Sequence, residues 1–214
     1  MKSFFASLLT ILCLAGCSSA YYGTMEKLGI DKREILVDRV KDARDSQQDA
    51  QEQFRSALEE FRALVDIDGG ELEDQYENLR EEFEDSQEAA EEIRDQIDSL
   101  EDVSTALFRE WEDELSQYTS DMLRRDSEQQ LKITRLRHGE LINKMRSAEA
   151  RLQPVLDSMG DQVLFLKHNL NAQAIRSLRG EFTLIDRDID ALIRAMEQAI
   201  NEADAFIADM TLEG

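Results

Sequence analysis

This 214-residue sequence has little cysteine, proline, histidine and glycine, and each shortage removes a class of structure or of site. Both cysteines, Cys13 and Cys17, lie near the amino terminus, so the rest of the chain has no thiol for a disulfide, a thiolate metal site or a catalytic nucleophile. One proline, Pro154, and nine glycines leave long stretches uninterrupted, which favours long helices. Neither a glycine-rich phosphate loop nor a nucleophile elbow is present. We therefore expect a fold that packing alone stabilises.

The two histidines, His138 and His168, lack the helical neighbours of a metal site, which needs a second ligand one turn away. No carboxylate, cysteine or histidine stands three or four residues from either of them. The many carboxylates fall on the polar sides of helical patterns, whereas a general acid needs an apolar pocket that shifts its pKa. We therefore expect no metal, no cofactor, no small-molecule substrate and no enzymatic activity. His138 lies on an apolar seam and is predicted in the core or at its boundary.

Basic residues are also few, because 25 Lys and Arg stand against 47 Asp and Glu, a formal net charge of −22. This balance excludes nucleic acid as a default partner, since binding to phosphates requires many basic side chains. The charge is uneven, with 22 acids and 5 bases in residues 71–128, and 4 acids and 9 bases in residues 129–180. In the interpretation that we favour, the basic segment lies beside the acidic one and screens it. The alternative is an acidic docking face for a basic partner.

The first residues do contain a pattern that is typical of secretory signals. Lys2 precedes the apolar run 4–14 and small residues follow, so residues 1–16 are predicted to be a signal peptide, too short to remain as a membrane span. Residues 17–30 are predicted to form the mature amino terminus and a tether to the folded body. Packing of Tyr21 and Tyr22 on that body is the alternative.

The residues Leu14-Ala15-Gly16-Cys17 resemble the lipobox of bacterial lipoproteins. The resemblance implies cleavage before Cys17, which then carries lipid on its sulfur and on its new amino group and attaches the chain to a membrane. Ser18 follows rather than Asp, which in this class of protein implies the periplasmic face of the outer membrane. The alternative is an ordinary secreted protein in which Cys17 is incidental.

Apolar residues recur at alternating steps of four and three, which is the heptad spacing of packed helices. Series of this kind run through residues 36–64, 72–100, 134–152 and 178–210. The first consists of Leu36, Val40, Ala43, Gln47, Ala50, Phe54, Ala57, Phe61 and Leu64. Strand-like alternation is missing, so we predict an all-α fold: an elongated antiparallel helical bundle with coiled-coil-like heptad seams, in one domain at 31–212.

The pattern allows two divisions of the middle of the chain into helices. Residues 100–104 hold no decisive breaker, so one long helix and two helices both stay open. The seam there reads Val103, Leu107, Trp111, Leu115, Tyr118 and Met122. Pro154 predicts a kink or a new helix, because proline lacks a backbone donor and clashes with the preceding turn. Residues 155–170 are denser in apolar side chains and are predicted to be the most buried part of the chain.

The least generic polar cluster of the chain consists of Lys167, His168, Asn169 and Asn171, which interrupt this apolar stretch. One interpretation is a contact point for a partner. The alternative, which we favour, is structural, since asparagine prefers helix ends and Asn169 or Asn171 would cap one.

Several segments together resemble DUF2959, a family of uncharacterised proteobacterial lipoproteins. They are residues 21–30, 32–40, 154–156, 163–172 and 189–207, so the resemblance covers nearly the whole mature chain. It implies a lipoprotein address and a helical body, and it carries over no reaction and no site residue.

The sequence thus predicts a non-enzymatic lipoprotein that Cys17 holds at the outer membrane, with an acidic helical body in the periplasm as an interaction, spacer or scaffold module. Its partners would be the membrane, through the lipid, and a protein or a second copy of the chain, because heptad seams serve self-association as well as internal packing. The alternative is a chaperone-like periplasmic holder of unfolded or hydrophobic clients.

Overall fold

The computed structural model describes residues 32–66 and 72–212, and these residues form five helices. They are α3 (Lys32–Asp66), α4 (Leu72–Leu115), α5 (Asp121–Glu149), α6 (Leu152–His168) and α7 (Ala172–Leu212). The two described ranges contain no strand, so the all-α prediction is confirmed. The predicted signal peptide, the lipid acceptor Cys17 and the tether lie outside the described residues.

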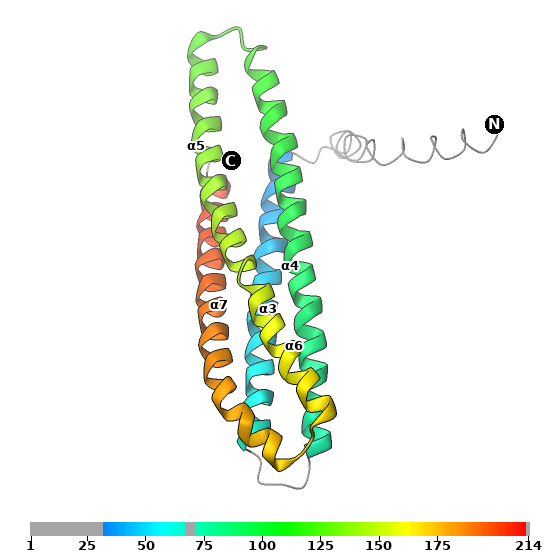
Figure 1. The fold of residues 1–214 in the computed structure, drawn as a ribbon. Helices are drawn as coiled ribbons and strands as arrows, with labels where there is room; N and C mark the ends of the chain where they lie inside the picture. The colour runs from blue at the N-terminus through cyan, green and yellow to red at the C-terminus, as the bar shows by residue number, and fades with distance from the viewer. Residues whose placement is uncertain (1–31, 67–71, 213–214) are drawn as a thin grey trace, which may run out of the picture.

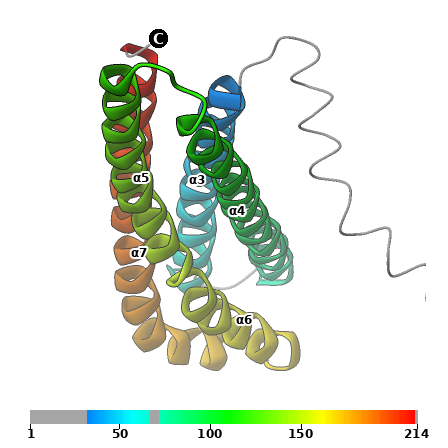
Figure 2. The same ribbon diagram turned by 90° about the horizontal axis from the view of Figure 1, so that it is seen from above.

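The helices run up and down along one axis and build an elongated bundle with four positions (Figure 1). Helix α3 packs against both α4 and α7, and α5 followed by α6 packs against the same two helices on the opposite side. In the view from above, α5 lies beside α7, and α3 lies between α7 and α4 (Figure 2). Helix α6 continues from α5 toward α4. The prediction of an elongated antiparallel bundle is therefore confirmed.

The seam of α3 is the most completely buried stripe of the molecule. All nine of its predicted positions are at most 2% exposed, from Leu36 at one end to Leu64 at the other. The seam of α7 behaves similarly, since from Ile185 to Met210 its predicted positions are all buried. Apolar side chains repeated at this spacing form a continuous stripe, and removal of that stripe from water drives the helices together.

Helices α5 and α6 together occupy one of the four positions of the bundle, because the chain bends between Glu149 and Leu152. Pro154 lies in the first turn of α6, where a missing backbone donor costs least, since the first N–H groups of a helix have no partner inside it. The break is short: the N–H of Ala150 still donates to the carbonyl of Arg146 at 2.9 Å. The predicted kink or new helix is confirmed as a new helix.

The structure corrects the seam that we predicted around residues 103–122. Helix α4 continues through residues 100–104 without a break, and the chain turns instead at residues 116–120. Tyr118 and Met122 are therefore not core residues, and their side chains are 42% and 67% exposed. The physical reason is Ser120, whose hydroxyl accepts a hydrogen bond from the N–H of Leu123 and so begins a new helix.

The prediction that residues 155–170 are the most buried part of the chain is wrong in its middle. Val163 and Leu166 face the core, whereas the side chains of Leu164 and Phe165 are 59% and 40% exposed. Four consecutive apolar residues span more than one turn of a helix, so all four cannot lie on one face.

Helices α4 and α5 project beyond the rest of the bundle (Figure 1). Helix α4 has 44 residues and α3 has 35. At a rise of 1.5 Å per residue these correspond to lengths of about 66 Å and about 52 Å. Helices α3 and α7 stop before this projection, and there Arg33 at the start of α3 donates to the backbone carbonyl of Met210 near the end of α7. Past this level the bundle has only two helices, whose connecting segment, residues 111–127, we call the hairpin tip.

One polar side chain interrupts the α3 seam. Gln47 is fully buried, and neither its Oε1 nor its Nε2 has a hydrogen-bond partner. A buried amide that loses its bonds to water without replacement destabilises the fold.

We expect Gln47→Met to raise the free energy of unfolding by about 1–3 kcal/mol, because Met has a similar length and no group that needs a hydrogen bond. Urea unfolding followed by circular dichroism measures this change. Gln51→Met is the matched control on the same helix, since Nε2 of Gln51 donates to the carbonyl of Ile193 at 3.2 Å and this bond would be lost. No gain for Gln47→Met over the wild type would contradict the prediction.

Candidate functional site

The predicted polar cluster lies at the corner where α6 meets α7. Lys167 and His168 end α6 and are exposed to solvent. The N–H of Asn169 donates to the carbonyl of Leu166 at 3.1 Å, and its Nδ2 donates to the carbonyl of Phe165 at 3.0 Å. Both bonds satisfy carbonyls at the end of α6, which have no partner inside the helix.

Asn171 begins the next helix. Its Oδ1 accepts hydrogen bonds from the N–H groups of Gln173 at 3.0 Å and Ala174 at 3.1 Å, which is the geometry of an N-cap. The interpretation of this asparagine as a helix cap is confirmed. The structure thus brings the four predicted residues together, but both asparagines bind backbone, so Lys167 and His168 are the cluster's candidates for a partner contact. The exposed Leu164 and Phe165 lie one turn before them and extend the candidate surface.

Ion pairs join the acidic and basic segments. Arg146 of α5 contacts Asp98 and Glu101 of α4, both at 2.5 Å. Arg135 pairs with Glu112 further along the same two helices, and this hydrogen-bonded guanidinium lowers the pKa of the Glu112 carboxyl. The preferred interpretation, in which the basic segment screens the acidic one, is confirmed. Exposed pairs of this kind contribute little individually, so their main effect is to reduce repulsion within the bundle.

A layer of aromatic rings surrounds His138 in the core. Its ring centroid lies 5.3 Å from that of Phe108 on α4 and 6.2 Å from that of Phe206 on α7, both edge to face. Burial lowers the pKa of His138 to about 4, although the nearby carboxylate of Glu101 opposes this shift. Its Nε2 is buried without a hydrogen-bond partner. The prediction of a core or boundary histidine is confirmed, and the ring is neutral at neutral pH.

The hairpin tip is the surface that sequence reasoning missed. Its two helices are held together through Ser127, whose Oγ accepts from Nε1 of Trp111 at 2.8 Å and lies 3.4 Å from the hydroxyl of Tyr118. Met122 and Leu123 extend from the start of α5 and are 67% and 50% exposed. The signal that would have located this turn is the run Tyr118-Thr119-Ser120-Asp121, in which a serine precedes an acidic first helical position.

An open groove of about 430 Å³ runs between α4 and α5 below the hairpin tip. Three leucines and four charged residues line it: Glu112, Leu115, Glu128, Leu131, Lys132, Arg135 and Leu136. Since two of the charges are acidic and two basic, the groove has no net charge.

Two general properties complete the description of residues 32–66 and 72–212. Across these ranges, no three or more side chains of His, Cys, Asp or Glu gather in a way that would hold a metal ion. None of the helices described there combines the length and the apolar character that crossing a membrane requires.

A family model described as a protein of unknown function, DUF2959, matches residues 21–210. The chain belongs to the DUF2959 family. No curated protein matches it. The DUF2959 match includes all of α3, α4, α5 and α6 and nearly all of α7. The family description names no reaction, ligand or partner, and function has to be argued from the chain itself.

Asn171→Ala is expected to lower the free energy of unfolding by about 1 kcal/mol, because two N–H groups of α7 lose their acceptor. Lys167→Ala and His168→Ala are the matched controls within the cluster. Both side chains are exposed, so each should change stability by less than about 0.5 kcal/mol. Thermal or urea unfolding measures all three, and equal losses for all three would contradict the cap as the main role of Asn171.

The buried His138 predicts a specific pH dependence of stability. Its pKa is about 4 in the folded chain, against an ordinary value near 6.5 when unfolded, so its contribution is complete above pH 6.5 and is lost as the pH falls toward 4. Relative to His138→Leu, the wild type should lose about 2 kcal/mol between about pH 8 and about pH 5. Urea unfolding at both values measures this difference. The control His168→Leu, which changes the exposed histidine, should lose as much stability between these two pH values as the wild type does. Equal losses for the wild type and His138→Leu would overturn the role of His138 in this pH dependence.

Proposed function

We propose that this chain is a non-enzymatic lipoprotein anchored through Cys17 to the periplasmic face of the outer membrane, with the helical bundle acting as a spacer or interaction module. The lipobox-like residues 14–17 support the anchor. One observation carries the role of the body: a single core joins the helices of the rod, and the described chain begins at Lys32, at the level where the projection of α4 and α5 starts (Figure 1).

Stiffness supports the role as a spacer. Helix α4 alone corresponds to about 66 Å, and four helices packed around one core resist bending far better than one helix does. Pairs such as Arg44–Asp204 and Arg62–Asp186 join α3 to α7 at opposite ends of that interface. A rod of this kind would hold a site at its far end at a defined distance from its anchored end.

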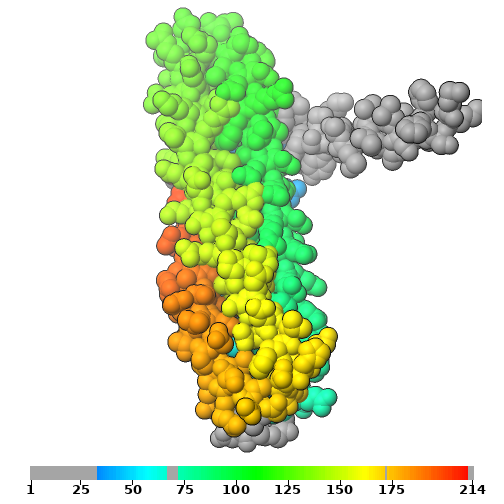
Figure 3. All heavy atoms as spheres, viewed as in Figure 1, coloured from blue at the N-terminus to red at the C-terminus, as the bar shows by residue number. Residues whose placement is uncertain are grey.

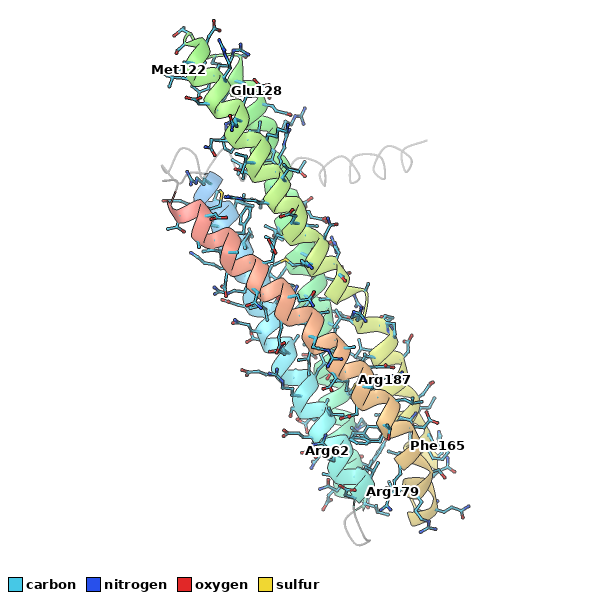
Figure 4. The ribbon with its side chains drawn as sticks, turned by 90° about the vertical axis from the view of Figure 1, so that its left-hand side faces the viewer. Arg62, Met122, Glu128, Phe165, Arg179 and Arg187 are labelled. Carbon is cyan, nitrogen blue, oxygen red and sulfur yellow. The ribbon has the colours of Figure 1, made fainter. Side chains whose placement is uncertain are left out.

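The distribution of apolar side chains favours contacts at the ends over a client-binding surface. Six of the seven exposed large hydrophobics lie in α5, α6 or the turn before α5, and the pairs Met122–Leu123 and Leu164–Phe165 stand at opposite ends of the rod (Figure 4). A holder of hydrophobic clients would need an extended apolar surface. The groove between α4 and α5 is short and is lined by four charged residues beside three leucines. Figure 3 shows α4, α5 and α6 next to one another on one face of the rod, with α4 and α5 alone at its upper end. We therefore favour the spacer or interaction module over the chaperone-like alternative.

Cys17→Ala should move the protein from the membrane fraction to the soluble periplasmic fraction, because it removes the proposed site of lipid attachment. Fractionation of cells with an antibody against the bundle measures the distribution. Cys13→Ala is the matched control, since this residue lies inside the proposed signal and its loss should leave the protein with the membranes. Continued membrane association of Cys17→Ala would overturn the proposed anchor.

A further inference from the structure

The hairpin tip gathers exposed apolar side chains at one extreme of the molecule. Tyr118, Met122 and Leu123 are 42%, 67% and 50% exposed, although a core normally takes such residues. All three lie within six residues of one another at the turn from α4 to α5. Figure 4 shows Met122 at the far end of the projecting helices, away from α3 and α7.

The tip stands clear of the rest of the bundle. The ion pair between Arg137 and Asp209, at 2.9 Å, marks a level that α5 shares with α7. From there α5 extends sixteen residues back to Asp121, about 24 Å, whereas α7 extends only three residues on to Leu212, about 5 Å. The apolar side chains therefore lie about 20 Å beyond the end of α7. A flat surface that approaches this end of the rod would contact them before it contacts α7.

The tip is also ordered. Ser127 accepts a hydrogen bond from Trp111 across the hairpin, and the Ser120 hydroxyl caps α5. Tyr118 in the turn and Met122 and Leu123 in the first turn of α5 are consequently held on a fixed backbone, and little backbone entropy is lost when they meet a surface.

The charge of the hairpin tip is divided along its length. Residues 111–115, at the end of α4, carry three acids and no base, whereas residues 116–127 carry Asp121 and Asp126 against Arg124 and Arg125. The outermost part is thus neutral overall, and its two arginines suit lipid phosphates. Tyrosine, with an apolar ring and a polar hydroxyl, suits the boundary between acyl chains and water.

The start of the described chain lies at the same end of the rod. Arg33 meets Met210, so Lys32 is level with the end of α7 and about 20 Å below the tip. Fourteen residues lie between Cys17 and Lys32, and the fifteen steps from one to the other span at most about 50 Å. A lipid on Cys17 and the side chains of the tip can therefore reach one bilayer at the same time.

We propose that Tyr118, Met122 and Leu123 form a second membrane contact, which inserts into the interface of the bilayer that holds the Cys17 lipid. This inference rests on the proposed lipid anchor. Two contacts would set the rod upright, with the α6–α7 corner and its exposed Lys167 and His168 directed away from that bilayer.

The test uses the full lipidated chain in vesicles of zwitterionic phosphatidylcholine. Met122→Cys and Leu164→Cys each introduce one thiol at an exposed apolar position, at opposite ends of the rod, and a lipidated Cys17 offers no other thiol to the label. Each variant carries the same environment-sensitive fluorophore. Far-UV circular dichroism confirms that both retain the helical fold, as expected for exposed positions.

The reference is the same labelled chain with Cys17→Ala, which carries no lipid, in buffer without vesicles. Relative to it, the label at position 122 of the lipidated chain in vesicles should emit further to the blue and about twofold or more intensely, while the label at position 164 stays unchanged. Unchanged emission at position 122 in chains that sediment with the vesicles would overturn the inference but leave the anchor intact. Blue-shifted emission at both positions in vesicles would overturn it in favour of a rod lying flat, and blue-shifted emission at position 122 already in buffer would overturn it in favour of a second copy on the tip. Chains that do not sediment with the vesicles would overturn the anchor and this inference together.

Discussion

The buried seam of α3 is the feature on which the rest of the molecule depends. Helix α3 packs against both α4 and α7, and its nine seam positions are almost completely removed from water. No disulfide is available to the body, so this burial has to hold the bundle together. The four-sided core ends where α3 begins and α7 ends, because only α4 and α5 continue past that level. The greater length of α4 therefore produces a two-helix projection instead of a longer bundle.

A chain with a formal net charge of −22 also has to limit its own repulsion. The order of the helices does this, because the basic α5 runs beside the acidic α4. Arg146 and Arg135 pair with Asp98 and Glu112, which lie 14 residues apart on α4, so compensation is spread along the contact. The core has its own polar positions, Gln47 and His138, which interrupt otherwise regular seams. Polar residues of this kind cost stability, and in packed helices they favour one register over its competitors.

Sequence spacing predicted the architecture well where one helix buries one stripe, as in α3. It also placed the bend near Pro154, because proline acts on the backbone locally, and it found the cap at Asn171. It failed at Tyr118 and Met122, where the steps of four and three continue by chance across a turn that Ser120 creates. The spacing shows which residues are apolar, but it does not show whether one helix continues through all of them. The exposure of Leu164 and Phe165 has a related cause, since apolar density does not say which face of a helix meets the core.

The two ends of the rod differ in chemistry as well as in position. One end has the hairpin tip, with exposed apolar residues and no net charge over residues 116–127, and the other has a corner with exposed apolar residues beside Lys167 and His168. A single attachment point fixes where a rod is but leaves its direction free, and a spacer is useful only when its direction is set. In the proposed arrangement, the projection of α4 and α5 supplies a second point at a distance from the first. The proposal thus gives the extra length of α4 a role in orienting the body, which packing alone does not give it.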